Sequence, residues 1–126
     1  MSQAARILVV DDTPANVKLL VDVLAAKGYA TLAAVNGLDG VAMALAHRPD
    51  LILMDIQLPD INGYEATARI RADAGCAAIP VVAFTASVTL TDRQRITDAG
   101  FNGFLGKPIE LKTFLATVRQ QLGEAS

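Results

Sequence analysis

Three short runs of apolar residues limit the folds open to this chain more than any other feature. They are Ile7–Val10, Leu51–Met54 and Val81–Phe84, and each is uncharged and rich in branched side chains. Four residues are too few for a typical helix, whereas a strand with both faces covered reads as a continuous apolar run. The runs therefore predict strands in the interior of a parallel sheet.

Helical patterns lie between these strands. Residues 14–27 place apolar side chains on one helical face, with Thr13 at the capping position, Pro14 in the first turn and Gly28 at the end. The remaining expected elements are a strand at Ala30–Ala34, a helix opened by Asn36 and Gly37, helices at Tyr64–Ala72, Thr91–Ala99 and Leu111–Leu122, and a strand at Phe101–Leu105. Five strand–helix units predict an α/β, doubly wound fold with right-handed crossovers and helices on both faces.

Length, charge and cysteine content narrow the class of protein. The chain has 126 residues, enough for a single domain over 1–126, and we expect no output domain. Its formal net charge of -2 gives no support to nucleic-acid binding or to attraction by an anionic membrane. One cysteine, Cys76 in an expected loop, and one histidine, His47 at a helix end, predict neither a disulfide nor a metal site. With no signal peptide or membrane span, these features indicate a cytoplasmic protein.

Polar side chains follow four of the predicted strands. Asp11 and Asp12 come after the first apolar run, Asp55 after the second and Thr85 after the third, and Lys107 follows the last strand. The carboxyl ends of parallel strands meet at one edge of a sheet, where ligands of open α/β folds bind. We therefore expect these five residues to converge.

Three carboxylates brought together repel one another unless a cation neutralises them. Oxygen ligands without thiol or imidazole favour Mg²⁺, for which Mn²⁺ or Ca²⁺ could substitute. One neutralised carboxylate can then attack a phosphoryl group and form an acyl phosphate, while Lys107 and the Thr85 hydroxyl contact the phosphoryl oxygens. The pattern predicts a phosphoryl acceptor, a metal site and a sensor of phosphorylation in one place.

Four motifs resemble the CheY-like response-regulator receiver family in order and spacing. They are Val9-Val10-Asp11-Asp12, Met54-Asp55-Ile56-Gln57-Leu58-Pro59, Thr85-Ala86 and Lys107-Pro108. The resemblance covers essentially the whole chain and implies a flavodoxin-like (βα)5 sandwich with strand order 2-1-3-4-5. Within the family, the Asp55–Pro59 and Lys107-Pro108-Ile109 segments are most similar to single-domain, DivK-like receivers.

The resemblance also implies a role for each residue of the site. Asp55 would take the phosphoryl group, with Thr85 and Lys107 as its catalytic partners. Asp12 and Asp55 would bind Mg²⁺ directly, Asp11 would act through water, and the backbone carbonyl of Gln57 would complete the protein ligands.

Further roles concern the switch and the lifetime of the phosphorylated state. The Lys107–Pro108 peptide bond would be cis. Thr85 and Phe104 would form the switch, and Gln57 and Ser87 would tune the lifetime of the acyl phosphate. Phe104 stands where the family often has tyrosine, and Gly106 is smaller than the residue usual before the lysine, so the sequence leaves open how Phe104 reports the phosphorylated state.

The same resemblance implies partners and a mode of signalling. A histidine kinase or a histidine phosphotransfer protein would phosphorylate the chain, and a protein target would recognise its altered surface. The chain would be a monomer or weak dimer in the cytoplasm, and it would catalyse only its own phosphorylation and dephosphorylation.

Three other functions are weighed against this reading. An aspartate-nucleophile phosphatase needs a second acid near Asp55, which Ile56 and Gln57 do not supply. A flavodoxin-like cofactor binder needs a phosphate-binding loop after the first strand, where this chain has two acids. A degenerate receiver that only binds proteins would not need the complete acidic set.

Overall fold

The computed structural model describes residues 4–86 and 89–123, and within them the chain forms one parallel sheet flanked by helices. The five strands are β1 (Arg6–Val10), β2 (Ala30–Ala34), β3 (Leu51–Asp55), β4 (Val81–Thr85) and β5 (Gly103–Gly106). The described helices are α1 (Pro14–Ala26), α2 (Gly37–His47), α3 (Gly63–Arg71), α4 (Leu90–Asp98) and α5 (Leu111–Gln121). Strands and helices alternate along the chain, as the apolar runs predicted.

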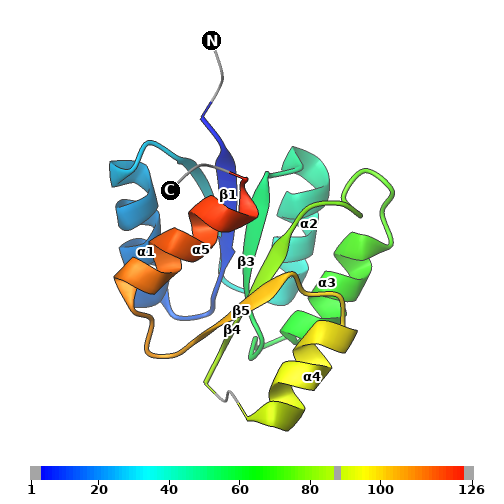
Figure 1. Cartoon of the computed structure of the whole chain (residues 1–126). Helices are drawn as coiled ribbons and strands as arrows, with labels where there is room; N and C mark the ends of the chain where they lie inside the picture. Colours follow the sequence, from blue (N-terminus) through cyan, green and yellow to red (C-terminus); the bar gives the residue numbers. More distant parts are fainter. Residues whose placement is uncertain (1–3, 87–88, 124–126) are drawn as a thin grey trace.

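The sheet has the order β2-β1-β3-β4-β5, and every neighbouring pair is parallel. Helices α1 and α5 cover one face, and α2, α3 and α4 cover the other (Figure 1). The flavodoxin-like class and the strand order implied by the resemblance are confirmed. Because the order reverses at β1 and β3, the ends of these two strands form the switch point where ligands bind in such sheets.

Each face of the sheet has its own core, because side chains alternate between the faces along a strand. The α1/α5 side contains eleven buried residues, among them Ile7, Leu53, Phe84 and Phe114. The opposite side contains thirteen, among them Leu8, Met54, Ile70 and Cys76. All five residues of β3 are buried, as they are in β4, which explains why these strands read as unbroken apolar runs.

Element boundaries agree with the sequence within one or two residues. The largest difference is at β5, expected at Phe101–Leu105 and observed at Gly103–Gly106. Phe101 instead closes α4, because its amide donates to the Ile96 carbonyl and the Gly100 amide donates to that of Thr97. This Schellman pattern brings Phe101 and Ile96 into the same core, so an apolar residue that resembled a strand residue belongs to a helix end.

One local expectation from the sequence needs correction. Thr13 occupies the N-cap position of α1, but its side chain makes no capping hydrogen bond. Its amide donates to Oδ1 of Asp11 at 2.8 Å. Cys76 lies in a turn, as expected, and its side chain is fully buried in the α2/α3/α4 core. Burial also raises the pKa of the Cys76 thiol, which makes it a structural residue.

None of the described helices has the length and hydropathy of a transmembrane segment.

Candidate active site at the carboxyl ends of the strands

The five polar residues expected at the strand ends lie at the carboxyl edge of the sheet. Asp11 and Asp12 follow β1, Asp55 and Thr85 are the last residues of β3 and β4, and Lys107 follows β5. Parallel pairing aligns these ends, with Asp55 opposite Phe84 and Thr85 opposite Gly106. The central position of β3 places Asp55 between the other groups.

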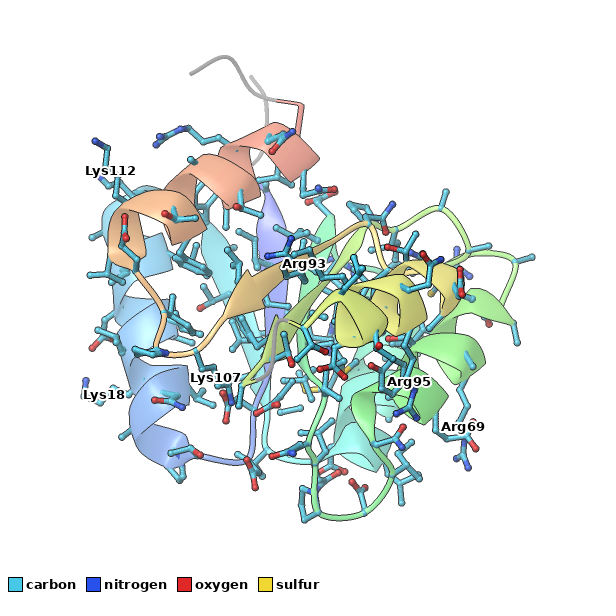
Figure 2. All side chains as sticks on the ribbon, turned by 60° about the horizontal axis from the view of Figure 1, so that its bottom comes forward. Lys18, Arg69, Arg93, Arg95, Lys107 and Lys112 are labelled. Carbon is cyan, nitrogen blue, oxygen red and sulfur yellow. The ribbon has the colours of Figure 1, made fainter. Side chains whose placement is uncertain are left out.

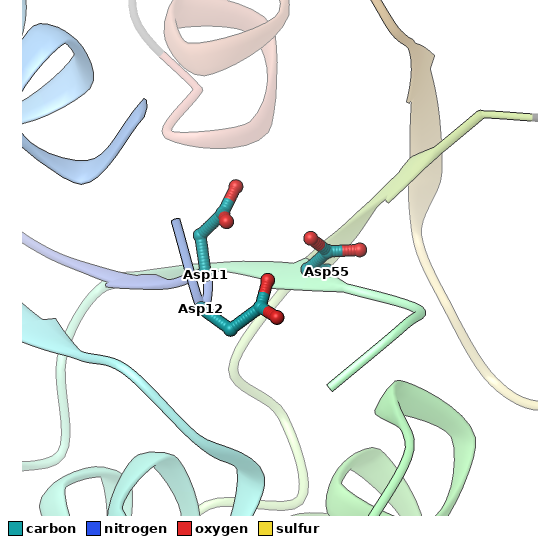
Figure 3. A group of neighbouring side chains, drawn as sticks. All are labelled: Asp11, Asp12 and Asp55. Atoms are coloured by element: carbon teal, nitrogen blue, oxygen red, sulfur yellow. The ribbon is translucent and has the colours of Figure 1, made fainter. Parts of the chain in front are cut away.

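Asp11, Asp12 and Asp55 gather into one acidic group (Figure 3). One carboxylate oxygen from each of them lies within 4.8 Å of the other two. Asp11 and Asp55 are buried, whereas Asp12 is exposed. Two buried carboxylates beside a third are unfavourable without a compensating positive charge. The group therefore provides the all-oxygen, negatively charged environment that a hard divalent cation requires.

Asp11 is the most buried member of this group. Its Oδ1 accepts the hydrogen bond from the Thr13 amide, but its Oδ2 is buried and has no hydrogen-bond partner among the described residues. The nearest cation is the Lys107 ammonium, at 3.7 Å from Oδ2. A buried carboxylate oxygen without a hydrogen bond is costly. The donor set thus fits a cation, or water bound to one, beside Asp11.

Lys107 supplies the permanent positive charge of the site, and Figure 2 shows it at the sheet edge. Its Nζ donates to Oδ2 of Asp55 at 2.6 Å. Desolvation acts to lower the pKa of Lys107, but the hydrogen bond and charge of Asp55, with Asp11 and Asp12, outweigh it and raise that pKa. Lys107 therefore remains protonated. The peptide bond between Lys107 and Pro108 is cis.

The Asp55 carboxyl is held by one hydrogen bond to each oxygen. Oδ1 accepts from the Gln57 amide at 3.0 Å, and Oδ2 accepts from Lys107. Burial nevertheless raises the pKa of Asp55 above its ordinary value, because desolvation and the charge of Asp11 together exceed the opposing effects of Lys107 and the Gln57 amide. A buried carboxyl whose pKa is shifted by desolvation and by neighbouring charges is a candidate functional group.

A cavity of about 190 Å³ opens beside Asp55. The part of its lining close to Asp55 consists of Thr85, Gln57 and Lys107. Residues of α3 and α4 complete the wall: Tyr64, Asp92 and Arg95. The Arg95 guanidinium lies 4.2 Å from the centre of the Tyr64 ring. Sequence reasoning did not identify these three residues, because they belong to helices rather than strand ends and no motif marks them.

Phe104 lies on β5, opposite Ala83, with the face of its strand directed toward α4. Thr85 is two residues beyond Ala83 and therefore shares this face. Phe104 is partly exposed, and the Arg93 guanidinium lies over its ring at 5.3 Å from the centre. Gly106 is the last residue of β5, and Ser87, expected to tune the lifetime, lies outside the described residues.

The other reactive side chains of the chain stand apart from this group. His47 is exposed at the end of α2, and Cys76 contacts the Ala44 carbonyl in the core. Among the described residues, one cluster of potential metal ligands was found, and it consists of the three aspartates. The site thus brings together a buried carboxylate, a cationic lysine, a hydroxyl and a group of carboxylate oxygens that could hold a cation. This combination is suited to phosphoryl transfer.

Comparisons with known proteins agree with this chemistry. Residues 7–119 match the response regulator receiver domain family. The polar-differentiation response regulator DivK of Brucella anthropi is 41% identical over 119 residues, which cover 94% of this chain and 97% of the relative. DivK of Brucella ovis is 40% identical over the same shares of both chains.

Solved structures show the same similarity. The receiver domain of the sensor histidine kinase PA1611 from Pseudomonas aeruginosa, described with a magnesium ion coordinated in its active site cleft, has a TM-score of 0.88 and 33% identity, covering 96% of this chain and 99% of that one. The chemotaxis response regulator CheY4 of Vibrio cholerae has a TM-score of 0.90 and 26% identity, with 94% and 99% coverage. Fold, site and sequence agree, and the chain belongs to the response-regulator receiver family, the phosphorylation-controlled switches of two-component signalling.

Proposed function

We propose that Asp55 is the phosphoryl acceptor of this receiver and that Mg²⁺ binds at the acidic group beside it. The observation that carries the proposal is the convergence of three carboxylate oxygens within 4.8 Å, next to a Lys107 ammonium 2.6 Å from Asp55. Asp12, Asp55 and the Gln57 carbonyl would hold the ion, and Asp11 would contact it through water. When bound, the ion would neutralise the acids and the phosphoryl oxygens.

The proposed transfer forms one bond and breaks one. A carboxylate oxygen of Asp55 attacks phosphorus, and the bond to the histidine nitrogen of the donor, or to the leaving oxygen of a small acyl phosphate, breaks with its electron pair. Lys107 then shifts from the free carboxylate to a phosphoryl oxygen. The adjacent cavity of about 190 Å³ has room for the incoming group. In hydrolysis, water attacks phosphorus, the bond to the Asp55 oxygen breaks, and inorganic phosphate leaves with the carboxylate restored. The chain would therefore catalyse only its own phosphorylation and dephosphorylation.

The switch would operate through Thr85 and Phe104. The Thr85 hydroxyl, at the edge of the cavity, would donate to a phosphoryl oxygen and draw the end of β4 toward Asp55. Phe104 shares the face of Thr85 and would move inward into the space vacated, giving up its contact with Arg93. Gln57 and Ser87 would tune the lifetime of the acyl phosphate. The result is a population shift of the α4–β5–α5 face.

Receivers of this family take phosphoryl groups from histidine kinases and act on downstream targets. The upstream partner proposed here is a histidine kinase or a histidine phosphotransfer protein, and the downstream partner is a protein. The DivK relatives are matched over 97% of their length, and a single receiver domain over 1–126 is part of the proposal. Action in the cytoplasm as a monomer or weak dimer is part of the same proposal, since histidine kinases draw their ATP from that compartment.

The test compares wild type with Asp55→Asn during incubation with acetyl phosphate and Mg²⁺. Wild type should gain one phosphoryl group, measured by intact mass, and Asp55→Asn should gain none because an amide is not a nucleophile. Asp22→Asn, at an exposed residue of α1, is the matched control and should be labelled normally. Equal labelling of Asp55→Asn would remove the residue from its proposed role.

Two further measurements separate the receiver from its alternatives. Thr85→Ala should still be labelled, but the change in the NMR signals of the Phe104 ring on phosphorylation should be smaller. A generic phosphatase substrate should not be turned over. Continuous turnover would favour an aspartate-nucleophile phosphatase instead.

A further inference from the structure

Asp60 lies outside the acidic group, and each of its two carboxylate oxygens accepts a hydrogen bond from another helix. Its Oδ1 accepts from the Gly37 amide at 2.7 Å, and its Oδ2 accepts from the Leu38 amide at 2.8 Å. These amides open α2, more than twenty residues earlier in the chain. Helix N-termini carry unpaired amides and a positive partial charge, so an anion here is favourable. Asp60 therefore caps α2 from a distant loop.

Asp60 and Asn36 divide the amides of the first turn of α2 between them. Asn36 is the local cap, and its side chain accepts from the Asp39 amide at 2.7 Å. The loop also packs directly against the helix, since a Cβ on Gly37 would lie 2.5 Å from Cγ1 of Ile61. The loop and α2 are thus joined by two hydrogen bonds and by close packing.

The loop that carries Asp60 joins β3 to α3 and begins at the phosphoryl acceptor. Its far end closes back on its start, because the Gly63 amide donates to the Ile56 carbonyl at 2.9 Å and a Cβ on Gly63 would collide with the Asp55 carbonyl. Within it, the Gln57 amide binds Asp55. A residue that fastens the middle of this short loop restricts the segment that contains Gln57.

We infer that Asp60 is a positioning residue that holds the Gln57 carbonyl in place for the cation and thereby couples the ion site to the first turn of α2. The inference rests on the Mg²⁺ site proposed above. Asp60 does not contact the ion, because both of its oxygens are directed at α2. Without this tether the loop would have to be ordered when the ion binds, and the entropy lost would weaken binding. Ion binding would in turn change the environment of the Gly37 and Leu38 amides.

The experiment titrates Mg²⁺ into wild type, Asp60→Asn and Asp60→Ala, with dissociation constants measured by calorimetry. Both variants lose the same negative charge, so a difference between them reports hydrogen bonding rather than charge. An asparagine oxygen still accepts from one α2 amide, and alanine accepts from none. We expect Asp60→Ala to bind roughly tenfold more weakly, the low end of the effect of losing a residue that orients a metal ligand, and Asp60→Asn to lie between it and wild type. Equal losses in the two variants would overturn the inference.

NMR supplies a readout that a merely stabilising role would not change. In wild type, the Gly37 and Leu38 amide signals should shift on Mg²⁺ addition with the same midpoint as Gln57. In Asp60→Ala, the Gln57 signal should still titrate, while those of Gly37 and Leu38 should not respond. Thermal unfolding without Mg²⁺ should show each variant to be folded.

The possible failures are distinguishable. Saturable Mg²⁺ binding to wild type with unchanged affinity in Asp60→Ala, or with no response at Gly37 and Leu38, would overturn the role of Asp60 and leave the ion site standing. No saturable binding to wild type would overturn the ion site itself and the inference with it. Asp22→Ala, which removes an exposed carboxylate paired with Lys18 on α1, should bind Mg²⁺ like wild type.

Discussion

Asp55 shows how a residue can be suited to reaction and unfavourable for folding. It is 3% exposed, beside the fully buried Asp11, and burial raises its pKa although Lys107 donates to it. A raised pKa means that the folded state resists the charged form more than the unfolded chain does. The charged form of Asp55 therefore lowers the stability of the metal-free protein.

Asp55→Asn should accordingly stabilise the metal-free protein at neutral pH, by ~1 kcal/mol, the scale of a single substitution. The native carboxyl takes up its proton at a higher pH than the unfolded one, whose ordinary value is 3.8. Wild type therefore gains stability as the pH falls through the native pKa, while Asp55→Asn has no such titration. The advantage of the variant should shrink toward pH 3.8. Urea unfolding with a chelator, over a pH series, measures this, and a variant less stable than wild type at neutral pH would contradict it.

At the scale of elements, α4 buries fewer residues than any other described helix. Ile96 is its one buried residue, and Arg93 and Arg95 reach aromatic rings on β5 and α3. The turn that follows α4 is fastened from α3, because Arg71 donates to the Gly100 carbonyl at 3.0 Å and to Oδ1 of Asn102 at 2.6 Å. The turn at the C-terminal end of α4 is thus tied to α3 by one side chain.

Arg71 also binds the carbonyls of Ala77 and Ile79 in the α3–β4 loop, so one side chain joins three segments. Arg71→Ala should reduce the free energy of unfolding by about 1.5 to 3 kcal/mol, because four hydrogen bonds from one charged donor are lost together. Arg69→Ala is the matched control, since its exposed ion pair with Glu65 has a separation of 3.7 Å and should contribute less than about 0.5 kcal/mol. Chemical denaturation compares the two. Equal losses of unfolding free energy in the two variants would show that Arg71 contributes no more to stability than the exposed Arg69.

At the scale of the whole molecule, the acidic group lies at the common end of the central strands. The sheet pairs β1 with β3, and β3 with β4. Repulsion among the acids therefore acts on the central strands of the sheet. A ligand that relieves this repulsion binds the folded state and has no assembled site in the unfolded chain. Ion binding and global stability are therefore linked.

Mg²⁺ at ten times its dissociation constant should stabilise wild type by about 1.4 kcal/mol, from the linkage between binding and folding. For a domain of this size, the melting temperature should rise by about 5 °C. Asp12→Asn should show a smaller rise, because it removes a proposed direct ligand. Scanning calorimetry with NaCl at matched ionic strength is the control for screening. An equal rise with NaCl would mean that no specific ion site exists.

Much of this protein follows from local sequence. The apolar runs that precede Asp55 and Thr85 could be identified as buried strands because both faces of β3 and β4 are covered. The polar residues that follow them had to share one edge, since parallel strands point the same way. The start of β5 was misplaced because Phe101 is apolar whether it pairs in a sheet or closes a helix.

Only the tertiary structure decided the contacts between segments that are distant in sequence. Helix packing decides the burial of Cys76, the contact of Arg93 with the Phe104 ring, and the part of the cavity wall formed by Tyr64 and Arg95. No local sequence pattern specifies this packing. The tether from Asp60 to α2 is of the same kind, because an acid in a turn has no local feature that names a helix more than twenty residues away. The periodicity of apolar residues and the local composition determine which elements form and which face of each is buried. The contacts between two elements depend on the folded shape of the whole chain.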